Sequence, residues 1–151
     1  MANPHRRWRW GNFPVPEAHL IVGAAGVVLG VVWPWTADGI RWWSTPAGSA
    51  LIGLGVGLMV WATRSAGRVR LADPDRIVTE GAYAISRHPM YVAWTLVYLG
   101  TAAILASAWL LVLLPLLAMW VHIETGREEQ RMIQEFGSVY TTYQNRVRRY
   151  L

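Results

Sequence analysis

The stretch MYVAWTLVYLGTAAILASAWLLVLLPLLAMWVHI, residues 90–123, decides the fold because it is apolar except for one short break. It contains no Asp, Glu, Lys or Arg. Each of its halves has about the length that an α-helix needs to cross the hydrocarbon core of a bilayer. We therefore predict two membrane spans, 90–105 and 109–123, joined by a tight connection at 106–108. Pro89 can begin the first of these helices without losing a hydrogen bond.

Two earlier apolar runs extend the same architecture. Residues 18–35 and 47–62 are further apolar blocks, in a chain that is 54% hydrophobic and 15% charged. Such blocks are typical of an integral membrane protein. The first run lacks a clear small-residue cleavage site, so it is interpreted as a retained span rather than a signal peptide. The predicted fold class is an all-α membrane bundle of about four spans, and residues 1–151 are predicted to form a single membrane domain.

Several features argue against other kinds of site. The chain has no Cys, which excludes disulfides, thiolate nucleophiles and Cys-ligated metals, and no metal site is predicted. The GLGVG motif at residues 53–57 lies inside an apolar helix and follows no strand. It is therefore interpreted as close helix packing through Gly53 and Gly57 rather than as a nucleotide-binding loop. Arginines beside membrane spans indicate topology and anionic lipid, so no nucleic-acid partner is predicted.

The arginines also predict the orientation of the bundle. With four spans, all the arginines except Arg41 fall on one side, in the N-terminal segment, in the polar loop 64–88 and after residue 123. Because cytoplasmic segments carry an excess of basic residues, we expect the N-terminus and the C-terminus to be cytoplasmic. A prokaryotic plasma (inner) membrane is the expected location for so short and Arg-rich a chain.

Two polar segments flank the last two spans and are expected to meet on the cytoplasmic side. The loop 64–88 is too charged to cross a bilayer, and loops of this length without a core of their own are usually functional or disordered. Residues 125–149 are predicted to form a C-terminal amphipathic helix that lies against the membrane or caps the bundle. Its apolar stripe has members at spacings of three or four: Met132, Phe136, Val139, Tyr140, Tyr143 and Val147.

The two segments carry motifs that resemble a known family. GAYAISRHPMYVAW at residues 81–94 and EEQRMIQEFGSVYTTYQNRV at residues 128–147 resemble the core of the isoprenylcysteine carboxyl methyltransferase and phospholipid methyltransferase superfamily. The resemblance covers about half of the chain, residues 76–149. Members of this superfamily are integral membrane enzymes that use S-adenosylmethionine. The resemblance implies methyl transfer to a lipophilic, membrane-embedded acceptor, with cofactor contacts from Ile77, Val78, Tyr83, His88, Pro89, Tyr91 and Glu128.

The chemistry of these residues agrees with such a cofactor. The positive end of the helix that begins near Pro89 suits the carboxylate of the methionine part, because backbone N–H groups are free in a first turn. Glu128 can accept a charge-assisted hydrogen bond from the ammonium group. Four tyrosines can pack on the adenine or face the sulfonium as a cation–π wall: Tyr83, Tyr91, Tyr140 and Tyr143.

One departure from the family pattern bears on the acceptor. In the isoprenylcysteine branch, an Arg implicated in binding the substrate carboxylate lies four residues before the Glu that matches Glu128, and here that position is Glu124. The expected acceptor is therefore an amine, thiol or hydroxyl of a lipid or isoprenoid, as an alternative to a carboxylate. Acceptors that shed a proton need a base, and the candidate catalytic residues are His88, His122 and Glu124. Our hypothesis is that Glu128 holds the cofactor and Glu124, one helical turn away, faces the acceptor.

Simpler interpretations of the same residues remain open at this point. His88 can be only a helix cap, Glu128 and Glu129 a solvated surface pair, and Tyr140 and Tyr143 apolar packing. The basic cluster Arg146, Arg148 and Arg149 can face lipid headgroups. Two other functions are also open. One is a membrane reductase that uses NADPH, and the other is a non-catalytic binding protein, for example one that holds haem through His19 and His122. The sequence predicts neither the oligomeric state nor the identity of the acceptor.

Overall fold

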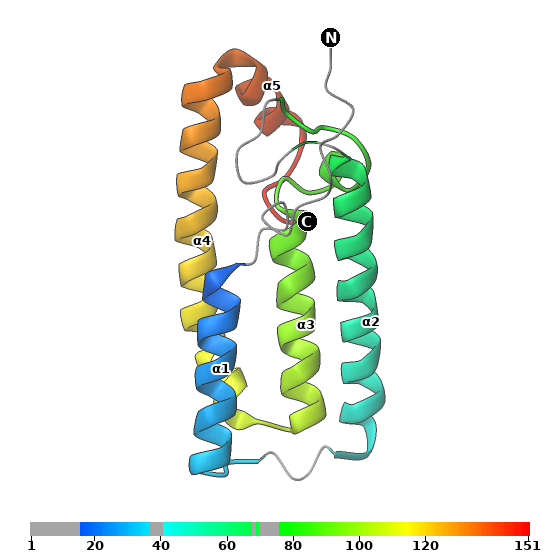
Figure 1. The fold of residues 1–151 in the computed structure, drawn as a ribbon, viewed down its shortest axis with the longest axis vertical. Coiled ribbons are helices and arrows are strands. Elements are labelled where there is room, and N and C mark those ends of the chain that lie inside the picture. The colour runs from blue at the N-terminus through cyan, green and yellow to red at the C-terminus, as the bar shows by residue number, and fades with distance from the viewer. Residues whose placement is uncertain (1–15, 37–40, 68, 70–75) are drawn as a thin grey trace, which may run out of the picture.

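The computed structural model describes residues 16–36, 41–67, 69 and 76–151, and these residues form a helical bundle without β-strands (Figure 1). The helices, in chain order, are α1 (Glu17–Val32), α2 (Arg41–Ala66), the short 3-10 helix η3 (Gly81–Ala84), α3 (Pro89–Leu105), α4 (Ala108–Phe136) and α5 (Ser138–Arg146). Helices α1 to α4 run side by side, and α5 lies near one end of the bundle. The predicted all-α membrane bundle is confirmed.

Two of these helices are long and apolar enough to cross a bilayer by themselves. They are α4 and the Ser44–Ala66 part of α2, whereas α1 and α3 are apolar but shorter. Large apolar side chains point outward from the bundle, such as Val31 at 76% exposure and Met119 at 58%. Apolar surface of this kind is suited to lipid rather than water. The number of spans, four, stays a prediction. The arginines at 6, 7, 9, 68 and 70, which contributed to the predicted orientation, lie outside the described residues.

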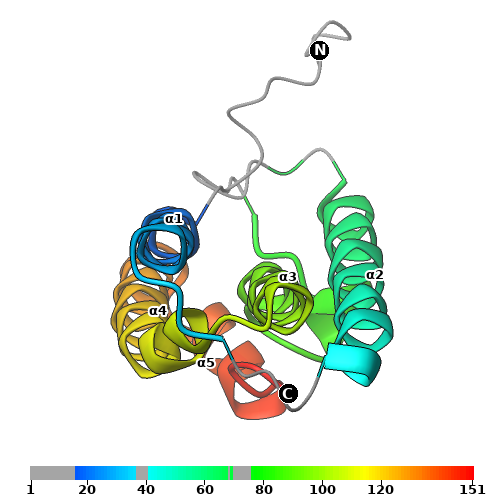
Figure 2. The same cartoon turned by 90° about the horizontal axis from the view of Figure 1, so that it is seen from below.

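The bundle is built from two helix pairs, α2 with α3 and α1 with α4 (Figure 2). In the first pair the backbones approach closely at Gly48 and Gly100, where a Cβ atom on either glycine would lie 2.6 Å from the carbonyl oxygen of the other. The prediction that Gly53 and Gly57 mediate packing is wrong, because nothing lies within 4 Å of a Cβ placed on them. Gly55 faces α3 instead, since it lies two helical turns from Gly48.

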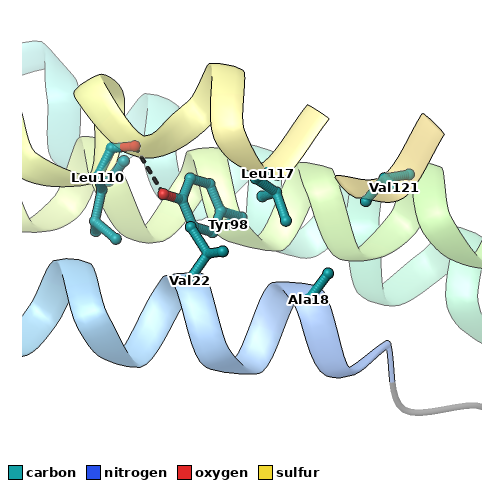
Figure 3. Packing of buried hydrophobic residues seen from close by; sticks show 7 residues of the cluster. Ala18, Val22, Tyr98, Leu110, Leu117 and Val121 are labelled. Atoms are coloured by element: carbon teal, nitrogen blue, oxygen red, sulfur yellow. Dashed lines mark hydrogen bonds between the residues drawn. The ribbon is translucent and has the colours of Figure 1, made fainter. Parts of the chain in front are cut away.

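The second pair, α1 with α4, packs around a buried apolar cluster to which α3 also contributes side chains. Figure 3 shows Tyr98 of α3 between Val22 of α1 and Leu110 of α4, with its hydroxyl donating a 2.7 Å hydrogen bond to the Leu110 carbonyl oxygen. A buried tyrosine hydroxyl needs such a partner. This contact joins the two pairs in the apolar part of the bundle.

The helices differ from the predicted segments at two places. α2 begins at Arg41 and includes Pro46, which was expected to precede the helix. A proline near a helix start removes a single hydrogen bond, so the helix continues through it. The segment 125–149 is not one separate helix, because α4 continues without a break to Phe136 and ends at Gly137, whose φ is 55°. The charged part of α4 after residue 123 therefore extends beyond the apolar part of the same helix and carries α5 back over the bundle (Figure 1).

Candidate functional site

A cavity of about 590 Å³ lies where this charged extension of α4 faces the start of α3. Its volume is within the range of small-molecule sites. The start of α1, the segment 76–91, the second half of α4 and α5 all contribute to its wall. All nine predicted cofactor residues line it: Ile77, Val78, Tyr83, His88, Pro89, Tyr91, Glu128, Tyr140 and Tyr143. Segments that are about 40 residues apart in the sequence therefore meet in one cavity.

His88 is held between two carboxylates at the edge of this cavity. Its Nδ1 lies 3.5 Å from Glu128 Oε2, and its Nε2 lies 3.2 Å from Glu129 Oε1. Both ring nitrogens can donate only in the imidazolium form. Burial alone would lower the pKa of His88, but the hydrogen bonds and charges of the two glutamates outweigh it and raise the pKa. With a carboxylate at each ring nitrogen and a raised pKa, His88 is not favoured as a base. Its side chain does not cap α3 either.

Glu129 is the buried centre of an ion-pair network, with a side chain that is only 4% exposed. Arg149 donates to its two oxygens at 3.1 and 2.6 Å, and Arg87 Nη2 lies 3.2 Å away. Burial by itself would raise the pKa of Glu129, but the hydrogen bonds from His88 and Arg149 and the charge of Arg87 lower it to about 2. The interpretation of Glu129 as a solvated surface residue is therefore wrong. Arg149 likewise pairs with this carboxylate rather than facing lipid.

The C-terminal segment, residues 147–150, runs beside the residues that precede α3. The backbone N–H groups of Arg87 and His88 donate to the carbonyl oxygens of Arg148 and Arg149, at 2.9 and 3.2 Å. Further along, the Tyr150 hydroxyl lies 3.0 Å from Thr125 Oγ1 on α4. The segment therefore ties the start of α3 to α4. Sequence reasoning missed this role because it assigned residues up to 149 to one amphipathic helix, whereas α5 ends at Arg146.

Glu128 remains directed at the cavity, with a side chain that is 38% exposed. The Tyr91 hydroxyl donates to its Oε1 at 2.8 Å. Beside it, the Tyr140 and Tyr143 rings meet edge to face at 5.8 Å, and burial raises the pKa of Tyr140 to about 12, so that its phenol is neutral at pH 7. Tyr143 donates a 2.7 Å hydrogen bond to the Tyr83 carbonyl oxygen. One carboxylate and a wall of neutral tyrosines thus face the same space.

The other two candidate bases lie in different places. Glu124 lines the cavity and pairs with the exposed Arg127 at 3.1 Å. His122 is not among the lining residues. It contacts Arg149 Nη1 at 3.4 Å and the Tyr150 hydroxyl at 3.5 Å. His19 is bonded to Thr95 instead. Among the described residues, the two histidines of the haem alternative therefore have separate partners and no shared site.

Comparison with known proteins identifies the family. A protein-family model described as phospholipid methyltransferase matches residues 43–139, well over half of the chain. The chain belongs to the phospholipid methyltransferase family. The match includes both the His88–Pro89 motif at the start of α3 and the Glu128–Glu129 pair on α4.

The names of individual relatives of this chain refer to different methyl acceptors. The chain is 31% identical over 122 residues to protein-S-isoprenylcysteine O-methyltransferase B of Arabidopsis thaliana, which covers 71% of this chain and 58% of that protein. It is 26% identical over 154 residues to methanethiol S-methyltransferase of Pseudomonas deceptionensis, covering 89% of this chain and 58% of the relative. The chain thus spans less than two thirds of the length of these relatives. No solved structure matches it.

Proposed function

We propose that this member of the phospholipid methyltransferase family transfers a methyl group from S-adenosylmethionine to a lipophilic acceptor in the membrane. One observation carries the proposal: the seven residues that the family motifs assign to the cofactor, together with Tyr140, Tyr143 and Glu124, line a single cavity. The charged end of the bundle is taken as cytoplasmic, in a prokaryotic inner membrane with both termini on that side. A water-soluble cofactor then enters from the cytosol, and the acceptor enters from the bilayer.

The residues present fit the cofactor chemically. Arg87 lines the cavity, and its Nε is buried without a hydrogen-bond partner in the part of the chain that the structure describes, so a donor is available for the carboxylate of the methionine part. Glu128 can accept a charge-assisted hydrogen bond from the ammonium group. The tyrosine wall and the apolar side chains of Ile77 and Val78 suit the adenine. When bound, S-adenosylmethionine supplies an electrophilic methyl group on a sulfonium sulfur.

The chain's own contribution to such a reaction is positioning and exclusion of water. His88 is fixed from both sides by Glu128 and Glu129, which holds the start of α3 against α4. In-line methyl transfer requires the acceptor atom, the methyl carbon and the sulfur of the donor to be held in one line. A closed site keeps water away from the donor and the acceptor. Glu124 is proposed to face the acceptor. A carboxylate at this position disfavours an acidic acceptor, so a thiol, hydroxyl or amine on an apolar chain is proposed.

The first test is calorimetric binding of S-adenosylhomocysteine to the protein in lipid nanodiscs. Glu128→Ala is expected to weaken binding at least about tenfold, because a hydrogen bond to a charged group contributes about 1.5–3 kcal/mol. His88→Ala is expected to weaken it as well. Gln130→Ala is the matched control, since Gln130 is exposed on the same helix turn and does not line the cavity. Absence of binding to the unaltered protein, or binding of NADPH in its place, would overturn the proposal.

A further inference from the structure

His19 of α1 is a buried imidazole with one ring nitrogen that has no hydrogen-bond partner among the described residues. The residue is 5% exposed. Its Nε2 lies 3.0 Å from Thr95 Oγ1, whereas its Nδ1 is buried without a hydrogen bond. An unsatisfied buried nitrogen is uncommon and calls for an explanation, such as a ligand or a role in catalysis. His19 also lies outside residues 43–139, the part that the family model matches.

The hydrogen bonds around Thr95 determine which nitrogen of His19 carries the proton. The Thr95 hydroxyl donates its only hydrogen to the Tyr91 carbonyl oxygen, one helical turn earlier, at 2.9 Å. It must therefore accept a hydrogen bond from His19, which places the imidazole proton on Nε2. Nδ1 then carries a free lone pair, so it can accept a proton.

His19 directly follows part of the cavity wall in the chain, although it does not itself line the cavity. The three residues before His19, at positions 16–18, all line the cavity wall. Across from it, the Tyr91 ring lies 6.4 Å from the His19 ring, and the Tyr91 hydroxyl donates to Glu128. Tyr91 thus stands between His19 and Glu128, the carboxylate proposed to bind the cofactor.

We propose that His19 Nδ1 is the proton acceptor for a thiol or hydroxyl group carried into the cavity on an apolar chain. This inference rests on the proposed function. The sulfur or oxygen lone pair of the acceptor forms the bond to the methyl carbon, and the bond between that carbon and the sulfonium sulfur breaks with its electron pair left on sulfur. The acceptor proton passes to Nδ1. Because Nδ1 is closed to solvent, the acceptor must displace part of the wall between Ala18 and Tyr91 to reach it.

The surroundings favour His19 over the other candidate bases. His88 has a carboxylate at each ring nitrogen, Glu124 is paired with Arg127, and His122 contacts Arg149 and Tyr150, whereas His19 Nδ1 has no hydrogen-bond partner among the described residues. Tyr91 on α3 has its ring 6.4 Å from the His19 ring, Glu17 lies two residues earlier on α1, and Glu124 and Glu128 on α4 line the adjoining cavity. A protonated His19 keeps its Nε2 hydrogen bond to Thr95.

The test compares the unaltered protein with His19→Gln in nanodiscs, with dodecane-1-thiol as the acceptor. Glutamine can still donate to Thr95 but cannot take up a proton. We expect kcat at neutral pH to fall about 100-fold or more, with unchanged melting temperature and unchanged S-adenosylhomocysteine affinity. The loss should shrink as rising pH ionises the thiol in advance. Thr95→Val is the matched control, because it removes the hydrogen bond to His19 but leaves the imidazole. The fall of kcat at low pH that His19 causes should therefore persist in Thr95→Val and disappear in His19→Gln.

A second measurement is independent of turnover. Nitrogen NMR of ring-labelled histidine in the unaltered protein should show the neutral His19 protonated on Nε2, and a proton on Nδ1 would overturn the inference. Turnover by His19→Gln with the pH profile of the unaltered protein would also overturn it, as would failure of the unaltered protein to methylate either dodecane-1-thiol or dodecan-1-ol. Failure of the proposed function looks different, since the unaltered protein would then not bind S-adenosylhomocysteine at all.

Discussion

Glu128 and Glu129 are neighbours on α4, yet their surroundings are opposite. The Glu129 side chain is 4% exposed and is bonded to His88, Arg87 and Arg149, whereas the Glu128 side chain is 38% exposed and faces the cavity. Adjacent helix positions point about 100° apart, so one carboxylate can turn into the protein while the next faces a ligand. The pair shows how one helix turn places one carboxylate inside the protein, where it holds the start of α3, and the next one at the cavity.

The largest expected difference between the two is in stability. Glu129→Ala leaves the buried cations of Arg87 and His88 without their carboxylate, so the free energy of unfolding should fall by about 3–5 kcal/mol. Glu128→Ala should cost about 1 kcal/mol or less, because its side chain is partly exposed. Thermal unfolding of both variants in nanodiscs measures the difference. Equal losses would show that the two carboxylates do not have separate roles.

The dependence of stability on pH should also reveal the role of Glu129. The pKa of Glu129 falls from its ordinary 4.5 to about 2, so its contribution to stability is complete above about pH 4.5 and is lost as the pH falls towards 2. The pKa of His88 is raised above its ordinary 6.5, so its contribution is complete below that pH and is lost as the pH rises through the raised value. Melting temperature against pH should show both limbs, and Glu129→Gln should remove the acid limb. If the melting temperature of Glu129→Gln fell at low pH as it does in the unaltered protein, Glu129 would not be the group responsible.

A smaller effect is expected at Arg149, whose guanidinium contacts both oxygens of Glu129. Arg149→Lys keeps the positive charge but loses the two-point contact, so we expect a loss of about 1 kcal/mol. Arg146→Lys is the matched control, because Arg146 is exposed and is not paired with Glu129. The same unfolding assay resolves the two variants. If they behave alike, the two-point contact adds nothing to the network.

The apolar helices could be predicted because their signals are local. The expected span 90–105 agrees closely with α3, Pro89–Leu105, since a continuous apolar run follows a proline that begins a helix. The length of α4 was missed, because charges after residue 123 suggested a new element although no residue there breaks the helix before Gly137.

The site was predictable only in part, because many of its contacts join residues that are far apart in the sequence. The family motifs named the residues that line the cavity, but Glu128 and Glu129 look alike in the sequence. Their roles depend on Arg149, twenty residues away along the chain and brought in by the C-terminal segment. The free nitrogen of His19 likewise depends on Thr95 of another helix. Contacts of this kind leave no periodic pattern, so only a three-dimensional structure reveals them.

The position of residues 147–150 has a consequence for the order of biosynthesis. These residues bridge the start of α3 and the second half of α4, and both of those elements precede them in the chain. The apolar helices can enter the bilayer while the ribosome is still translating, because their insertion depends on their own hydrophobicity. The ion-pair network around Glu129 can close only after Arg149 has left the ribosome. A nascent chain stalled before Arg149 would therefore sit in the membrane without the Arg149 contacts to Glu129.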